Sequence, residues 1–220
     1  MSQDDNFFYL TFSLILLLLG TALAQQFFSY SVQHLMQSAT VITLIVAVWG
    51  VDSERLILRK ALIFPLAIIA VALMSYWLDT TGFDYIHLFL LLFFFIFTAQ
   101  QTAKQVLFTG EIDGNKILGA ICLYLLMGLI WAILFTLMQL SFVRSFQGLG
   151  DSTEWFTIFP DFIYFSFVTL TTLGFGDIAP VQPVARFLVY LEAIIGQLYL
   201  AILVASLVGS RMSAVSNKGQ

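Results

Sequence analysis

The feature that most constrains this chain is a series of six apolar stretches, each close to the ~20 residues that cross a lipid bilayer as a helix. Because lipid offers no hydrogen-bond partner to a backbone, stretches this long are expected to be helices, and no alternating strand pattern competes. The sequence therefore predicts an all-α integral membrane protein. The stretches cover roughly 7–24, 35–51, 61–78, 85–98, 117–142 and 184–208.

The composition excludes several classes of protein. Apolar residues make up 60% of the chain and charged residues 10%, against ~45–50% and ~25% in soluble domains. This excludes a soluble globular enzyme. A net charge of −4 leaves no basic surface for nucleic acid, and the single cysteine, Cys122, excludes both an intrachain disulfide and a paired-cysteine metal site.

The distribution of charge predicts the orientation in the membrane. Short cytoplasmic loops collect Lys and Arg, and an even number of spans places both termini on one side. With both termini in the cytoplasm, only Arg144 and Arg186 lie outside. The basic residues then inside are Arg55, Arg59, Lys60, Lys104, Lys116, Arg211 and Lys218. We therefore expect a multi-pass protein of the cell membrane, with acidic outer loops that raise the local concentration of cations.

The segment between the fifth and sixth stretches is expected to enter the membrane without crossing it. Residues 160–171 read PDFIYFSFVTLT, which as a helix is ~18 Å long. Pro160 suits the first turn of such a helix, and Asp161 would complement the positive end of its dipole. The sequence predicts a re-entrant helix here.

The motif TTLGFGD at 171–177 resembles the filter of tetrameric potassium channels, here of a prokaryotic six-span member located in the inner membrane of a bacterium. The resemblance implies a four-helix domain at 1–110 and a pore domain at 111–220. It places the outer helix at 117–142, the pore helix at 160–171, the filter at 172–177 and the inner helix at 184–208. It further implies that four copies assemble around one axis.

In that family, backbone carbonyls replace the hydration shell of K⁺. The resemblance assigns K⁺ binding to Thr172, Leu173, Gly174 and Phe175, with Gly176 completing the filter. Turning successive carbonyls to one side needs positive φ at some positions, which glycine adopts without steric cost. The side chains of Leu173 and Phe175 should then point away from the axis, and the Thr172 hydroxyl should face the innermost site.

The resemblance also names supporting residues around the filter, beginning with Thr171 at the end of the pore helix. Asp177 matches the acidic residue at the outer end, and Tyr164 matches an aromatic residue that hydrogen-bonds it. Phe165 and Phe175 replace residues with polar tips, so we expect them to form an apolar packing layer behind the filter. Val168 occupies a position where some members have a glutamate.

The last apolar stretch contributes a predicted cavity and gate. Glu192 is an acidic residue deep in a span and therefore a candidate functional residue. We expect it between the inner and pore helices, bound to a hydroxyl such as that of Ser166 or Thr169, in a structural or a pH-sensing role. Gly196 matches the family's inner-helix hinge, and close helix packing is an equally good reading. The residues assigned to the face that lines the cavity are Gln197, Leu200, Val204 and Val208.

The expected activity is passive K⁺ conduction, without enzymatic chemistry and without a cofactor. Steep voltage dependence needs several moving charges, whereas the fourth stretch and its flank carry only Lys104 at the cytoplasmic end. A voltage-gated channel is therefore not expected. Two alternatives remain open, a weakly selective cation channel and a non-conducting regulatory subunit. The expected partners are K⁺, three further copies of the chain and the lipid bilayer.

Overall fold

The computed structural model describes residues 6–27, 67, 70, 82–108, 114–142, 144–150 and 154–218. Apart from positions 67 and 70, the predicted spans at 35–51 and 61–78 lie outside these residues.

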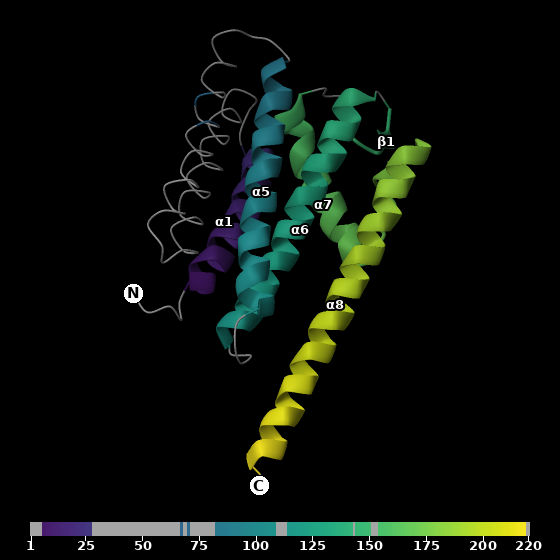
Figure 1. Cartoon of the computed structure of the whole chain (residues 1–220). Helices are drawn as coiled ribbons and strands as arrows, with labels where there is room; N and C mark the ends of the chain where they lie inside the picture. The colour runs from purple at the N-terminus through teal and green to yellow at the C-terminus, as the bar shows by residue number, and fades with distance from the viewer. Residues whose placement is uncertain are drawn as a thin grey trace.

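Four of the described helices are long and apolar enough to cross a membrane. They correspond to the predicted stretches at 7–24, 85–98, 117–142 and 184–208. Each begins before its predicted stretch, and all but α6, which ends one residue early, also end after it. Helix α1 begins and helix α8 ends toward the same end of the molecule (Figure 1). The four helices are α1 (Asn6–Phe27), α5 (Gly82–Phe108), α6 (Gly114–Ser141) and α8 (Pro183–Lys218).

The predicted re-entrant helix is α7 (Trp155–Leu170), whose 16 residues are too few to cross a bilayer. It begins five residues earlier than predicted, so Pro160 lies inside the helix rather than in its first turn. The earlier start is explained by Trp155, which is buried and donates a hydrogen bond from Nε1 to Asp84 at 3.1 Å. The predicted dipole role of Asp161 is also wrong, because the first turn holds no acidic residue.

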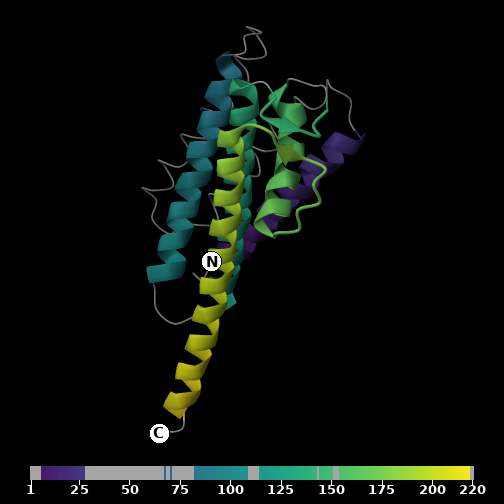
Figure 2. The same ribbon diagram turned by 90° about the vertical axis from the view of Figure 1, so that its right-hand side faces the viewer.

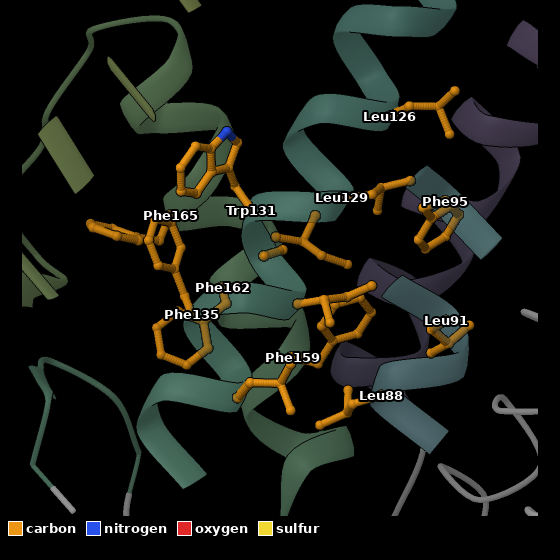
Figure 3. Packing of buried hydrophobic residues seen from close by; sticks show 14 of the residues in the cluster. Leu88, Leu91, Phe95, Leu126, Leu129, Trp131, Phe135, Phe159, Phe162 and Phe165 are labelled. Atoms are coloured by element: carbon orange, nitrogen blue, oxygen red, sulfur yellow. The ribbon is translucent and has the colours of Figure 1, made fainter. Parts of the chain in front are cut away.

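Helix α6 is the centre of the described fold, and α1, α5, α7 and α8 all pack against it. Aromatic rings fill the space between α6 and α7. The Phe135 ring centroid lies 5.3 Å from that of Phe165 and 6.1 Å from that of Phe162. Figure 3 shows these rings among the other buried residues. Leu88, Leu91 and other buried residues extend the core toward α5. Each Å² of apolar surface that is buried in this way contributes ~25 cal/mol of favourable free energy, and this burial keeps α7 packed beside the longer helices.

The first part of the chain contacts α7 of the same chain. Gln25, near the end of α1, donates from Nε2 to Asp161 Oδ1 at 2.6 Å. Asp84, in the first turn of α5, accepts the hydrogen bond from Trp155. Helix α7 is therefore held by α1 and α5 as well as by α6. Within the chain, α1 and α5 both pack on α6, and α1 also packs on α7.

Helix α8 is the least covered of the long helices. It contacts α6 and α7 along its first half and then extends past the ends of the other described helices (Figures 1 and 2). Two short strands, β1 (Phe146–Gln147) and β2 (Ala179–Pro180), pair in an antiparallel arrangement just before α8 begins. The large apolar side chains that α8 leaves exposed are Val184, Phe187, Tyr190, Ile194, Ile195, Leu198, Ile202, Val204 and Val208.

Candidate functional site

The segment that follows α7 is tied to the end of that helix by its own N–H groups. The carbonyl oxygen of Val168 accepts from the N–H of Leu173 at 2.9 Å and from the N–H of Gly174 at 3.4 Å. In a planar trans peptide the N–H and the preceding C=O point in opposite directions. The carbonyls of Thr172 and Leu173 must therefore point away from α7, toward the open side of the chain.

The backbone angles of the same segment alternate in sign. Thr172, Gly174 and Gly176 have positive φ values of 59°, 57° and 79°, whereas Leu173 and Phe175 between them do not. A Cβ at Gly174 or Gly176 would have no atom within 4 Å, so conformation rather than crowding requires glycine at both positions. Positive φ was predicted for glycines here. Its occurrence at Thr172, a β-branched residue, was not predicted and is a strained conformation.

The side chains of the segment face outward from the single chain. Leu173 is 60% exposed and Phe175 is 66% exposed, and the segment runs back from the end of α7 toward the start of α8 (Figure 2). The Thr172 hydroxyl donates to the Thr171 carbonyl at 2.7 Å, and the Thr171 hydroxyl donates to Phe167 O at 2.6 Å. Both hydroxyl oxygens retain lone pairs that can accept a cation.

Residues 119–212 match a family model described as an ion channel. The match runs from α6 through α7 and the segment just described into α8, so this part of the chain is similar to an ion channel domain. The apolar helices and this match together support a multi-pass membrane protein. Comparison with curated proteins and with solved structures found no match.

Tyr164 and Asp177 form a side-chain hydrogen bond at the end of residues 172–177, here called the filter segment after the motif that they resemble. The Tyr164 hydroxyl lowers the pKa of the Asp177 carboxyl below its ordinary value and outweighs the opposing effect of desolvation, and the Ile178 backbone adds to the lowering. Tyr164 also stacks on Phe175, with nearly parallel rings 6.5 Å apart. Asp177 is therefore held in its ionised form at the end of the filter segment.

The Tyr164→Phe variant tests the effect of this hydrogen bond. A depressed pKa keeps Asp177 ionised to lower pH, so removing the hydroxyl should let the carboxyl protonate at higher pH. We expect cation flux through reconstituted protein to decline at a higher pH in the variant than in the wild type as the outer solution is acidified. The Tyr190→Phe variant, which removes an exposed hydroxyl on α8, should leave the pH profile unchanged; identical profiles for all three proteins would contradict the role of Tyr164.

Phe165 does not pack on Phe175 within the chain as predicted. It is buried on the opposite side of α7, where its ring contacts Phe135 and Phe146, and it is Tyr164 that stacks on Phe175. The difference follows from the helix period, because adjacent residues point ~100° apart. Val168 is also buried, and its carbonyl rather than its side chain holds the filter segment.

Glu192 is completely buried where α8 meets α6 and α7. Its Oε1 lies 2.5 Å from Ser166 Oγ, which in turn lies 2.8 Å from the carbonyl oxygen of Gly128. The expected contact with Ser166 is therefore present, and it links α8, α7 and α6. Glu192 lies in the part of the chain that was predicted to form the cavity and gate. Because its side chain is completely buried, it does not line an open surface.

Gly196, one turn after Glu192, is buried on the same face. A Cβ there would lie 2.8 Å from Leu170 Cδ2 and 3.0 Å from the Leu170 carbonyl oxygen. Of the two predicted readings, this geometry supports close packing, and α8 runs through Gly196 as one helix. On the other side of α8, Gln197, Val204 and Val208 are exposed and Leu200 is partly buried.

The sequence did not point to the loop that precedes α7. Gly148 has a φ of 87°, and its backbone lies against the Asp177 carbonyl. The only signal that could have drawn attention to it is a glycine in a polar loop, which is too common to be informative. In the same region, Arg186 donates from Nε to the Pro180 carbonyl oxygen at 3.3 Å.

Proposed function

We propose that this protein is a subunit of a K⁺-selective channel and conducts K⁺ passively down its gradient. The observation that carries the proposal is the direction of the filter carbonyls. The N–H groups of Leu173 and Gly174 are bound to Val168, so the preceding carbonyls face the open side of the chain. A row of carbonyl oxygens on one side can replace the hydration shell of a monovalent cation without any covalent chemistry or cofactor.

One chain supplies only one side of such a coordination shell, which is why we propose a tetramer. Carbonyls at 172–175 from four copies around an axis would surround the ion. The exposed side chains of Leu173 and Phe175, together with the uncovered apolar face of α8, would then contact neighbouring copies. Large apolar patches left open on one chain are typical of surfaces buried on assembly or in lipid.

The proposed ion pathway continues along α8 below the filter. Gln197 is exposed and would face hydrated ions in a cavity, while Leu200, Val204 and Val208 would form an apolar constriction that opens and closes by wetting. Helix α5 contains no arginine, so we propose that the stimulus is not membrane voltage.

The test is an ion-flux measurement on purified protein in liposomes. A K⁺ gradient should drive flux that Ba²⁺ blocks, and the reversal potential in opposed K⁺ and Na⁺ gradients should lie near the K⁺ equilibrium value. The mass of the purified assembly should be four times that of one chain. A reversal potential near zero would favour a weakly selective cation channel, and absence of flux from a fourfold assembly would favour a non-conducting regulatory subunit.

A further inference from the structure

We propose that residues 145–148 and 177–181 form an outer clip that holds the exit of the filter, and that Gly148 is the positioning residue of this clip. The inference rests on the proposed function, because it assigns a role at the outer end of the ion pathway. It concerns the loop between α6 and α7, to which neither the motif nor the family match assigns a role.

The clip is held together by backbone hydrogen bonds. Strands β1 and β2 pair with Phe146 opposite Pro180 and Gln147 opposite Ala179. The carbonyl oxygen of Ser145 accepts from the N–H of Val181 at 2.8 Å. These bonds join the loop after α6 to the stretch between the filter and α8.

Gly148 is the point at which the loop contacts the filter itself. Its φ of 87° is one that L-residues rarely adopt. A Cβ at this position would overlap the Asp177 carbonyl oxygen and would lie 2.9 Å from the Asp177 carbonyl carbon and 3.1 Å from Ile178 Cα. All three neighbours are backbone atoms, which cannot rotate away as the end of a side chain can. Only glycine allows the two backbones to approach this closely.

The loop side of the clip is rigidly anchored. Phe146 is buried, with its ring centroid 4.9 Å from that of Phe162 and 5.5 Å from that of Phe135. Its N–H donates to Gln139 Oε1 at 3.1 Å, and the fully buried Ser145 donates from Oγ to Phe142 O at 2.7 Å. Ser145 and Phe146 are therefore anchored in the α6–α7 core, whereas Gln147 and Gly148 lie at the surface.

Asp177 is consequently held from two sides. Tyr164 binds its carboxylate from α7, and Gly148 abuts its backbone carbonyl from the loop. Selectivity by carbonyls depends on how closely they keep their positions. If the outer clip moves, the backbone that follows the outermost carbonyls of the filter moves with it.

The experiment compares two alanine variants of glycines in the same loop. Gly148→Ala should displace the Asp177 backbone and lower the K⁺/Na⁺ permeability ratio of the reconstituted channel by about tenfold or more. Gly150→Ala is the matched control, because Gly150 has no positive φ and a Cβ there would meet no atom within 4 Å; its ratio should equal that of the wild type. Assembly of each variant is checked by size-exclusion chromatography with light scattering.

A second variant keeps the proposal testable if Gly148→Ala fails to assemble. Val181→Pro removes the N–H that binds Ser145, at a side chain that is 42% exposed, and it should lower the permeability ratio in the same direction. Wild-type ratios in assembled Gly148→Ala, or in Val181→Pro where Gly148→Ala does not assemble, would overturn the outer clip. Absence of K⁺ selectivity in the wild type would instead overturn the proposed function.

Discussion

Alanine at Gly174 is expected to abolish K⁺ flux while leaving the helices intact. The φ of Gly174 is 57°, and an L-residue in this region costs roughly 1–2 kcal/mol. In a fourfold filter the cost is repeated in every copy and reaches about 4–8 kcal/mol. The alternative is for alanine to return to negative φ, which turns the Leu173 carbonyl away from the ion. Either outcome removes the conducting conformation.

Gly20→Ala serves as the matched control for this prediction. Gly20 lies inside α1, has no positive φ and would place a Cβ in open space, so alanine should stabilise the helix by about 1 kcal/mol. Flux and thermal unfolding in detergent measure the two effects separately. Undiminished K⁺ flux in Gly174→Ala would show that the positive φ is not needed for conduction and would remove the basis of the proposed carbonyl ring.

Loss of the Glu192 side chain is expected to destabilise the pore region substantially. The Ser166 hydroxyl carries one hydrogen yet contacts both the Gly128 carbonyl and Glu192 Oε1. A carbonyl can only accept, so both contacts form hydrogen bonds only when Glu192 is protonated and donates to Ser166. Leaving a buried polar group without its partner costs about 1–3 kcal/mol, and a vacated volume adds to this.

Two substitutions at this position separate the hydrogen bond from the charge. Glu192→Gln retains a donor for Ser166 and should match the wild type in unfolding temperature and flux at neutral pH, whereas Glu192→Ala should lower the unfolding temperature by several degrees. Ser141→Ala, at an exposed serine at the end of α6, controls for the loss of a hydroxyl. A Glu192→Gln protein as unstable as Glu192→Ala would show that the ionised form is required and that the neutral assignment is wrong.

A double-mutant cycle with Ser166→Ala measures the coupling directly. If the two side chains stabilise each other, the double variant should lose less than the sum of the single variants. Strict additivity would indicate that the contact contributes nothing beyond packing.

Much of the membrane architecture follows from sequence pattern. The apolar stretches that become α1, α5, α6 and α8 are long enough that helices are the only solution in lipid. The positive φ of Gly174 and Gly176 also follows, because carbonyls cannot face one side of an extended chain without such angles. The Tyr164–Asp177 pair was predicted from the spacing in the family motif.

Other features were decided by contacts between residues far apart in the chain. The start of α7 depends on a hydrogen bond between Trp155 and Asp84, which are 71 positions apart. The helix propensity of the residues around Trp155 carries no information about a partner this distant in the sequence. The need for glycine at 148 exists only because Asp177 lies against it.

The sequence by itself determined that the chain forms long apolar helices and that a short glycine-bearing segment follows a helix too short to cross a bilayer, since length, hydropathy and backbone sterics are local properties. Only the tertiary structure decided that Phe165 packs into the core, that Gly196 allows close approach of Leu170 and that Glu192 joins three helices. Each of these depends on which surfaces meet, and that is set by the packing of the whole molecule.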